Sequence, residues 1–322
     1  LIGPVVHERN STTTETAGFP VGCHGQTLTL HSRSLGMNIS AILFDRFQRP
    51  RSGWRFAIFV LGFFLVGILA GAVAVGIMVA LGVTASPGNP AFLVVNGIVS
   101  LSAALFVGWI CGRYLEHLPF SSLGAAFTKG WLTDLAVGML LGVLTFAIAA
   151  LIGILTGGLS FRPNTEAGYL AIASTLAFSL SVFAAAAAFE EAVFRGYILQ
   201  TFVRSDLSLF AVVFTSAIFA TVHNANPNAN FLSWVNTFLA GVWFAVSYLK
   251  TRTLWFPFGL HLAWNWAQGS IFGVEVSGLT EIVKAPILRE SDAGPAWLTG
   301  GDYGIEGGIV CTAALILSII VI

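Results

Sequence analysis

The chain has 322 residues, of which 56% are hydrophobic and only 9% are charged, with 15 basic and 15 acidic residues. A soluble domain carries roughly 25% charged residues, so this composition excludes a water-soluble globule with an ordinary charged surface. The zero net charge identifies no partner by itself, and we expect no nucleic acid to be one.

The first 50 residues form a polar segment. Residues 1–36 are rich in Thr, Ser and Gly and lack the apolar core of a signal peptide. Met37 opens a more typical start, MNISAILFDRFQRPRSGWR, and is a candidate natural initiator. We therefore expect residues 1–50 to be a disordered tail ahead of the first membrane span.

Long windows without Asp, Glu, Lys or Arg follow this tail. A membrane-spanning helix needs about 20 mostly apolar residues, and two of the windows hold two spans each, separated by ASPGNP and by HNANPNAN. The sequence therefore predicts an all-α fold, a polytopic transmembrane helical bundle of about eight spans. The last one ends early, at LILSIIVI and without a flanking charge, which indicates a C-terminal truncation. The expected spans are 55–84, 91–113, 132–157, 168–204, 207–223, 231–250, 254–274 and 307–322.

The Lys and Arg residues between these spans predict the orientation. Nine lie on one side of the predicted membrane and three on the other, and cytoplasmic loops carry the excess of positive charge. Both termini are therefore expected in the cytoplasm, with the acidic loop 276–306 outside. The nine are Arg46, Arg49, Arg51, Arg55, Arg113, Lys129, Arg204, Lys250 and Arg252, and the three are Arg162, Lys284 and Arg289.

Glu190, Glu191 and Arg195 form the first candidate cluster, in AFEEAVFRGYILQ. Polar groups inside hydrocarbon are costly and face the bundle interior or a wet cavity. At about 100° per residue, Glu191 and Arg195 lie about 40° apart on a helix, which suits an ion pair. Glu190 lies roughly 140° from Arg195, so we expect a structural Glu191–Arg195 pair and a free Glu190. The alternative is a solvated, inactive charge cluster at a helix end.

His223 is the second candidate, at the end of SAIFATVH. The fourth and fifth spans are joined by a very short turn around 205–207, which makes them an antiparallel hairpin. Glu190 and His223 are equidistant from that turn, so we expect them at matching depth. Isolated membrane histidines are also often hydrogen-bonded or helix-terminal residues, and the sequence alone does not show that these two side chains face each other.

His261 and Asn265 form the third candidate, at i,i+4 in HLAWN on the seventh span. Asn265 offers both a donor and an acceptor, but such a pair also serves as hydrogen-bonding contact between membrane helices. The asparagine-rich loop HNANPNAN has a simpler interpretation, a turn with a helix break at Pro227 and a cap at Asn230. The cysteines Cys23, Cys111 and Cys311 are scattered, so we expect neither a disulfide framework nor a thiolate metal site.

Two histidines, a free carboxylate and an amide that converge in a dry cavity would make a hydrolytic site. A glutamate there can act as a general base towards water, and the histidines can orient that water or hold a metal. An amide and an imidazole can donate to the oxyanion of a tetrahedral intermediate. No serine is paired with a histidine at a recognisable spacing.

The three clusters together resemble a family signature. EEAVFR fits EExxxR, FATVH fits FxxxH and HLAWN fits HxxxN, in that order and on separate helices. The chain resembles the CPBP family of intramembrane proteases, also called the ABI or CAAX-protease group, over about residues 180–270. The resemblance implies a membrane endopeptidase that acts on membrane-associated proteins or peptides, in a bacterial inner membrane.

The resemblance also implies roles for the residues. Glu190 would be the general base, supported by Glu191 and Arg195, and His223 would position the water. His261 and Asn265 would bind water or stabilise the oxyanion. The expected organisation is N-terminal transmembrane helices at 51–160, a CPBP-like catalytic membrane core at 161–275, an extracytoplasmic loop at 276–306 and an incomplete last helix at 307–322.

Metal dependence stays open at this point. The family is commonly labelled metalloprotease, yet the sequence has no HExxH motif, and His223 and His261 lie on different predicted helices. A zinc ion held by His223, His261 and Glu190, with an open position for water, is one possibility. A metal-free site with Glu190 as the base is equally compatible.

Two other functional classes compete with an endopeptidase that cleaves in the cytoplasmic half of the membrane. A non-catalytic immunity or scaffold protein could use the same buried polar network to hold its helices. A proton- or ion-coupled transporter also needs buried Glu, Arg and His, but the inverted repeats typical of transporters are not evident, because the polar clusters all lie in the second half. The sequence does not indicate an oligomeric state.

Overall fold

The computed structural model describes residues 39–86 and 89–322. Most of the tail predicted at 1–50 therefore lies outside the described residues, including Met37 and Cys23. Residues Ser40–Ile322 make up one structural unit. Its elements are α1 (Ile39–Leu43), α2 (Ser52–Ala80), α3 (Pro90–Leu115), η1 (Phe120–Leu123), α4 (Trp131–Leu155), β1 (Leu159–Pro163), α5 (Tyr169–Glu191), the π-helical η2 (Ala192–Ile198), α6 (Leu199–Val203), α7 (Ser208–Val222), η3 (His223–Ala225), α8 (Phe231–Thr251), α9 (Trp255–Trp266), the π-helical η4 (Ala267–Ile271), β2 (Leu288–Asp292), α10 (Ala296–Thr299), η5 (Gly301–Tyr303), η6 (Ile305–Gly307) and α11 (Ile309–Val321).

Six helices of the described part are long and apolar enough to cross a membrane. The predicted seventh span, 254–274, is divided between α9 and η4, and the predicted eighth is α11, a shorter apolar helix of 13 residues. The prediction of a multi-pass integral membrane protein built from helices is thus confirmed, with fewer full-length spans than eight. The six are Ser52–Ala80, Ala91–Leu115, Trp131–Leu155, Tyr169–Val203, Ser208–Ala225 and Phe231–Thr251.

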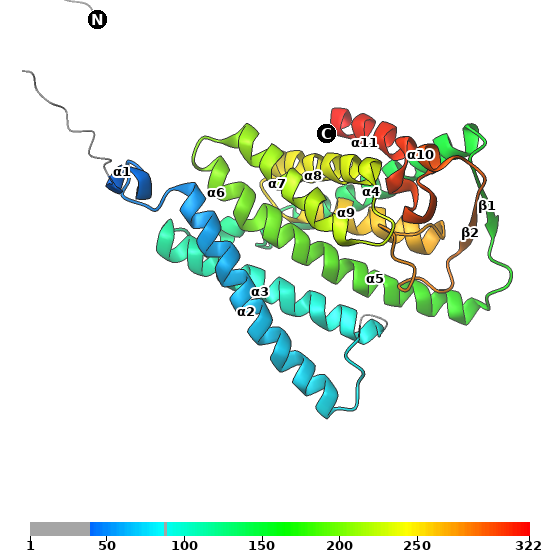
Figure 1. Cartoon of the computed structure of the whole chain (residues 1–322), viewed down its shortest axis with the longest axis horizontal. Coiled ribbons are helices and arrows are strands. Elements are labelled where there is room, and N and C mark those ends of the chain that lie inside the picture. Colours follow the sequence, from blue (N-terminus) through cyan, green and yellow to red (C-terminus); the bar gives the residue numbers. More distant parts are fainter. Residues whose placement is uncertain (1–38, 87–88) are drawn as a thin grey trace, which may run out of the picture. The chain divides into compact units, whose positions relative to one another are not determined.

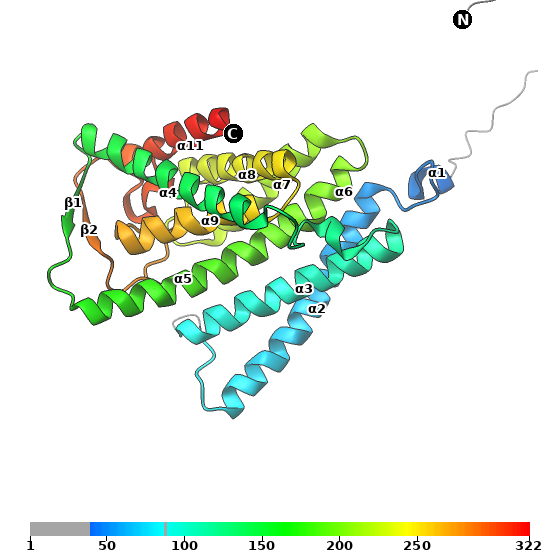
Figure 2. The same cartoon turned by 180° about the vertical axis from the view of Figure 1, so that it is seen from behind.

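The predicted all-α helical bundle is confirmed, and one short antiparallel strand pair accompanies the helices of the described residues. β1 pairs with β2 so that Leu159 lies opposite Asp292 and Pro163 opposite Leu288. Each strand has only five residues. The two strands come from distant parts of the sequence, so no local sequence pattern predicts their pairing. Both lie at the same end of the bundle as α10 (Figures 1 and 2).

The helices pack in a defined order around the core. α2 and α3 form a hairpin, α3 packs against α5, α4 runs along α9, and α8 lies between α7 and α11. Figure 1 and the reverse view in Figure 2 both show α2 and α3 on one side of the bundle. Most apolar side chains of α2 are exposed, Leu61 and Ile68 among them, as expected of a helix that faces lipid.

Glycines bring α4 and α9 into close contact. A Cβ atom at Gly142 would lie 2.5 Å from the carbonyl oxygen of Leu260, and one at Gly138 would lie 2.4 Å from that of Phe256. The two glycines form a GxxxG pattern, the small-residue spacing that lets membrane helices approach closely. This contact fixes the position of α9, the helix that carries HLAWN.

Gly142→Leu is therefore expected to destabilise the protein by about 1–3 kcal/mol, the usual cost of overpacking, and to lower any activity that depends on α9. Thermal unfolding in detergent measures the first effect. Gly71→Leu on α2 is the matched control, because a Cβ there meets no atom within 4 Å. Equal melting temperatures for the two variants would contradict the packing argument.

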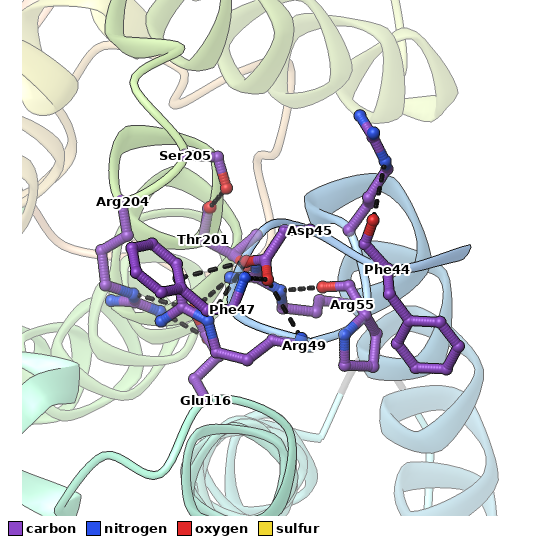
Figure 3. A network of polar contacts seen from close by, with 11 residues as sticks. Phe44, Asp45, Phe47, Arg49, Arg55, Glu116, Thr201, Arg204 and Ser205 are labelled. Carbon is purple, nitrogen blue, oxygen red and sulfur yellow. Dashed lines mark hydrogen bonds and ion pairs between the residues drawn. The ribbon is translucent and has the colours of Figure 1, made fainter. Parts of the chain in front are cut away.

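A buried ion network joins three helices at the end of the bundle opposite β1, β2 and α10 (Figures 1 and 3). The Glu116 side chain is fully buried after the end of α3. It accepts a hydrogen bond from Arg55 at the start of α2. It also accepts two from Arg204 just after α6, at 3.0 Å (Nε to Oε1) and 2.8 Å (Nη2 to Oε2). Arg55 also contacts Asp45 at 3.3 Å. The network ties the α2–α3 hairpin to the helix that carries the glutamate pair.

The Glu116 network should make stability depend on pH. Burial alone would raise the pKa of Glu116, but the hydrogen bonds and charges of Arg204 and Arg55 outweigh it, so the pKa lies below its ordinary value of 4.5. The carboxylate thus contributes stability that is present above about pH 4.5 and is lost as the pH falls through the folded-state pKa. Glu116→Gln should be less stable than wild type at pH 7, and the difference should shrink at acidic pH. Thermal unfolding of both proteins from pH 3 to 7 checks this, and a pH-independent difference would contradict it.

Candidate active site

The two glutamates end α5, and the π-helical η2 begins immediately after them. Glu191 Oε1 and Arg195 Nη1 lie 3.0 Å apart and both side chains are buried, so the predicted pair is confirmed. Arg195 also donates to the carbonyl oxygen of Gly241 on α8 (Nη2 to O, 3.0 Å). Its guanidinium lies 4.8 Å from the ring centre of Phe219 and 5.1 Å from that of Phe244, so cation–π contacts and the carboxylate together hold the buried charge.

Glu191 holds a second group besides Arg195. Its Oε1 lies 3.0 Å from Nδ1 of His261 on α9. The Phe244 ring stacks on the imidazole, with ring centres 4.6 Å apart and planes 18° apart. A carboxylate only accepts hydrogen bonds, so Nδ1 carries the proton in this contact. Glu191 therefore fixes both the rotation and the tautomer of His261, and Nε2 points away from it.

His223 is fixed in the same way from its own helix. Its Nδ1 lies 2.7 Å from the carbonyl oxygen of Phe219, one turn earlier. A carbonyl oxygen also only accepts, so Nδ1 donates and Nε2 keeps its lone pair. The Phe219 ring packs on the imidazole, with centres 4.5 Å apart.

Glu190 lies between the two imidazoles. Its Oε2 is 3.8 Å from Nε2 of His223 and 3.8 Å from Nε2 of His261. These separations are too long for direct hydrogen bonds, and Oε2 is buried without a hydrogen-bond partner among the described residues. The expectation that Glu190 is free of Arg195 and level with His223 therefore agrees with this geometry.

A cavity of about 290 Å³ adjoins these three side chains. Asn265 lines it, and its amide makes no hydrogen bond to another described residue. The structure thus brings the six predicted residues together in two groups. Glu190, His223, His261 and Asn265 face the cavity, and the buried Glu191 and Arg195 support His261 from behind.

Several side chains around the cavity were not anticipated from the sequence. Phe244 and Trp264 form part of its wall, and Glu306 enters it from the segment before α11. Glu306 accepts hydrogen bonds from Trp264 Nε1 (3.0 Å) and from the backbone amide and hydroxyl of Ser277 (2.7 Å each). Isolated residues in long loops carry no motif, so nothing in the sequence distinguishes Glu306.

The asparagine-rich loop has the predicted structure and one further contact. Asn230 Oδ1 accepts from the Ser233 amide at 3.0 Å, and the Ser233 hydroxyl accepts from the Asn230 amide at 2.8 Å, which together form the capping box of α8. Asn226 in the same loop lines the cavity. The loop is therefore both a turn and part of the cavity wall.

The donor atoms suit zinc in kind but not in spacing. Two imidazoles and one carboxylate are common zinc ligands, and bonds of 2.0–2.2 Å in a tetrahedral site place ligand atoms about 3.3–3.5 Å apart. Glu190 lies 3.8 Å from each histidine. No group of three or more His, Cys, Asp or Glu in the described part of the chain is arranged to hold a metal ion. The residues as placed do not fit a bound zinc ion.

Comparison with known proteins bears on the same region. No curated protein sequence matches the chain. Residues 172–267 match the family described as Type II CAAX prenyl endopeptidase Rce1-like. That range contains EEAVFR, FATVH and HLAWN, and with them all six side chains grouped at the cavity. The segment that carries the three motifs is therefore similar to the CPBP/CAAX protease family of membrane endopeptidases.

Proposed function

We propose that this protein is an intramembrane endopeptidase in which Glu190 activates water for attack on a peptide bond of a membrane-associated substrate. The observation that carries the proposal is the position of the Glu190 carboxylate, 3.8 Å from Nε2 of both His223 and His261. Both histidines have their other ring nitrogen anchored. The three groups thus direct free lone pairs into one cavity.

The arrangement supports a complete hydrolytic cycle. A water molecule that donates to Glu190 Oε2 and to His223 Nε2 is held with its own lone pair towards the cavity. Glu190 takes its proton as the oxygen attacks the carbonyl carbon, and the Asn265 amide donates to the developing oxyanion. Glu190 then returns the proton to the leaving amine as the C–N bond breaks. One water is consumed, and a new carboxylate and a new amine are formed.

Glu191 and Arg195 act through His261 in this scheme and are positioning residues. The Arg195 charge neutralises Glu191 in a buried setting, and Glu191 in turn orients His261. His261 Nε2 then faces Glu190 rather than the helix interior. This division explains why two adjacent glutamates are present, one as the base and one as the support.

A zinc-dependent reaction is the competing chemistry within the same function. It would use His223, His261 and Glu190 as ligands, and zinc would supply a more acidic bound water. The 3.8 Å separations favour the glutamate mechanism as the proposal, and metal removal distinguishes the two. We expect activity to survive a chelator that strips zinc; its complete loss, with recovery on adding zinc, would favour the metal site.

The function is tested by incubating the purified full chain in liposomes with a library of membrane-anchored peptides, with Glu190→Gln as the matched inactive protein. We expect cleavage by wild type only, and one ¹⁸O atom in the new carboxyl group when the reaction runs in labelled water. A stable wild-type protein that cleaves none of the peptides would favour the scaffold alternative, in which the same network only holds the helices.

A further inference from the structure

The cavity at the candidate active site carries negative charge without a positive charge to balance it. Glu190 and Glu306 line it, and no Lys or Arg of the described residues does so. The two lining histidines each donate through Nδ1 and present a lone pair, so neither adds a positive charge. Behind the wall, the buried charges of Glu191 and Arg195 cancel each other. A cleft with charge of one sign and low-dielectric walls attracts groups of the opposite charge.

Glu306 is the acidic group of this cavity that the catalytic scheme does not use. It lies in η6, just before α11 and outside the matched segment 172–267. None of the ion pairs among the described residues includes it. An ionisable side chain among membrane helices is costly and marks a functional site by default. Glu306 therefore needs a role that the six motif residues do not supply.

The Glu306 carboxylate is held firmly in the cavity wall. Trp264 Nε1 on α9 donates to Oε1 at 3.0 Å, and the backbone amide and hydroxyl of Ser277 both donate to Oε2 at 2.7 Å. The Asn236 amide on α8 donates to the backbone oxygen of Glu306 at 2.8 Å. The position of the charge is thus fixed by two helices and by the loop after η4.

One acceptor site on this carboxylate is still free. An ionised carboxylate can accept about four hydrogen bonds, and the described residues supply three, of which Oε1 receives only the one from Trp264. A neutral amide could fill the remaining site but would leave the negative charge unbalanced. An ammonium or guanidinium group supplies both the donor and the opposite charge, in the stronger, charge-assisted kind of hydrogen bond. The free site therefore suits a cation.

This acceptor lies close to the reacting groups along α9. Trp264, which holds Glu306, comes three residues after His261 and directly before Asn265. Three residues of helix rise by about 4.5 Å, and an extended peptide advances about 3.3 Å per residue. A substrate side chain that reaches Glu306 therefore belongs to a residue within about three positions of the bond that is cleaved.

We propose that Glu306 selects substrates with a lysine or arginine side chain within three residues of the scissile bond. This inference rests on the proposed function and names a feature of its substrates. Glu306 binds the cationic side chain and takes no part in proton transfer, which stays with Glu190. An acidic substrate residue at the same position would add a third negative charge to the cavity, so it is rejected.

A series of anchored peptides tests this selection. Each carries Lys, norleucine or Glu at one of the three positions on either side of the scissile bond, and kcat/KM is measured with the full chain in liposomes. At one position we expect wild type to cleave the Lys peptide at least tenfold better than the other two. Glu306→Gln should lose this preference, and Glu306→Asp, which keeps the charge, should retain it. A structural role would change kcat/KM for all the peptides alike, so an unchanged ratio in Glu306→Gln would overturn the proposal.

The wild-type measurement decides by itself if Glu306→Gln does not fold, because equal cleavage of the three peptides at every position would refute the selection. Glu281→Gln is the matched control, since Glu281 is exposed in the loop that carries Ser277 and does not line the cavity. It should keep the preference for Lys, and an equal loss in both variants would remove Glu306 from the role.

Binding separates this inference from the proposed function. A wild type that cleaves none of the peptides would refute the endopeptidase, and fluorescence anisotropy of the same labelled peptides on that protein would still test the site. We then expect the Lys peptide to bind at least tenfold more tightly than its Glu counterpart at one position. Equal affinities at every position would overturn the selection by Glu306.

Discussion

Glu190→Gln is expected to lower kcat by about 10²–10⁴-fold, the usual contribution of a general base, and to leave the melting temperature unchanged. Glutamine keeps the shape of the side chain but cannot take a proton from water. The carboxylate makes no hydrogen bond to a described residue, so its loss removes no contact that stabilises the fold. Single-turnover cleavage of an anchored peptide measures the rate, and thermal unfolding in detergent measures the stability.

Glu191→Gln, one position along the helix, is the matched control. It removes the charge that pairs with Arg195 and leaves one neutral amide oxygen where the carboxylate accepted from both Arg195 and His261, so we expect it to lower stability and activity together. The contrast between neighbouring glutamates is the informative result. Retention of activity within about tenfold by Glu190→Gln would remove Glu190 from the role of base and direct attention to another group at the cavity.

The sequence predicted best those features of the site that depend on the geometry of one helix or of two helices joined by a short turn. The i,i+4 spacing predicted the Glu191–Arg195 pair, and the short turn after α6 predicted that Glu190 and His223 lie at one depth; the pair distance of 3.0 Å and the His223–Glu190 distance of 3.8 Å agree with both. Both inferences needed only helix geometry and two segments joined by a short turn.

Other features depend on contacts that no local pattern encodes. The link from His261 to Glu191 joins two helices that are far apart in the sequence, and helical geometry assigned Glu191 only to Arg195. The pairing of β1 with β2 and the placement of Glu306 in the cavity wall arise in the same way from distant segments. The π-helical turn of η2 follows α5 directly and carries Arg195, and an ordinary helical pattern does not reveal it.

Arg195→Met is expected to cost about 3–5 kcal/mol of unfolding free energy, because it leaves a buried carboxylate without its charged partner. Arg195 is fully buried, pairs with Glu191 and donates to Gly241, and methionine fills much of its volume without replacing these bonds. Arg195→Lys should recover only part of the loss, since a single ammonium lacks the planar fork that reaches both acceptors. Chemical or thermal unfolding in the same detergent measures each difference.

The double variant Glu191→Leu/Arg195→Met distinguishes a charge effect from a packing effect. Removing both partners leaves no unpaired charge, so it should be more stable than Arg195→Met alone even though it carries one more substitution. It should nevertheless be inactive, because His261 has lost the carboxylate that orients it. If the double variant loses at least as much unfolding free energy as Glu191→Leu and Arg195→Met lose together, the pair contributes through packing. Recovery of stability without activity would show that Glu191 and Arg195 are retained for the position of His261 rather than for the strength of the fold.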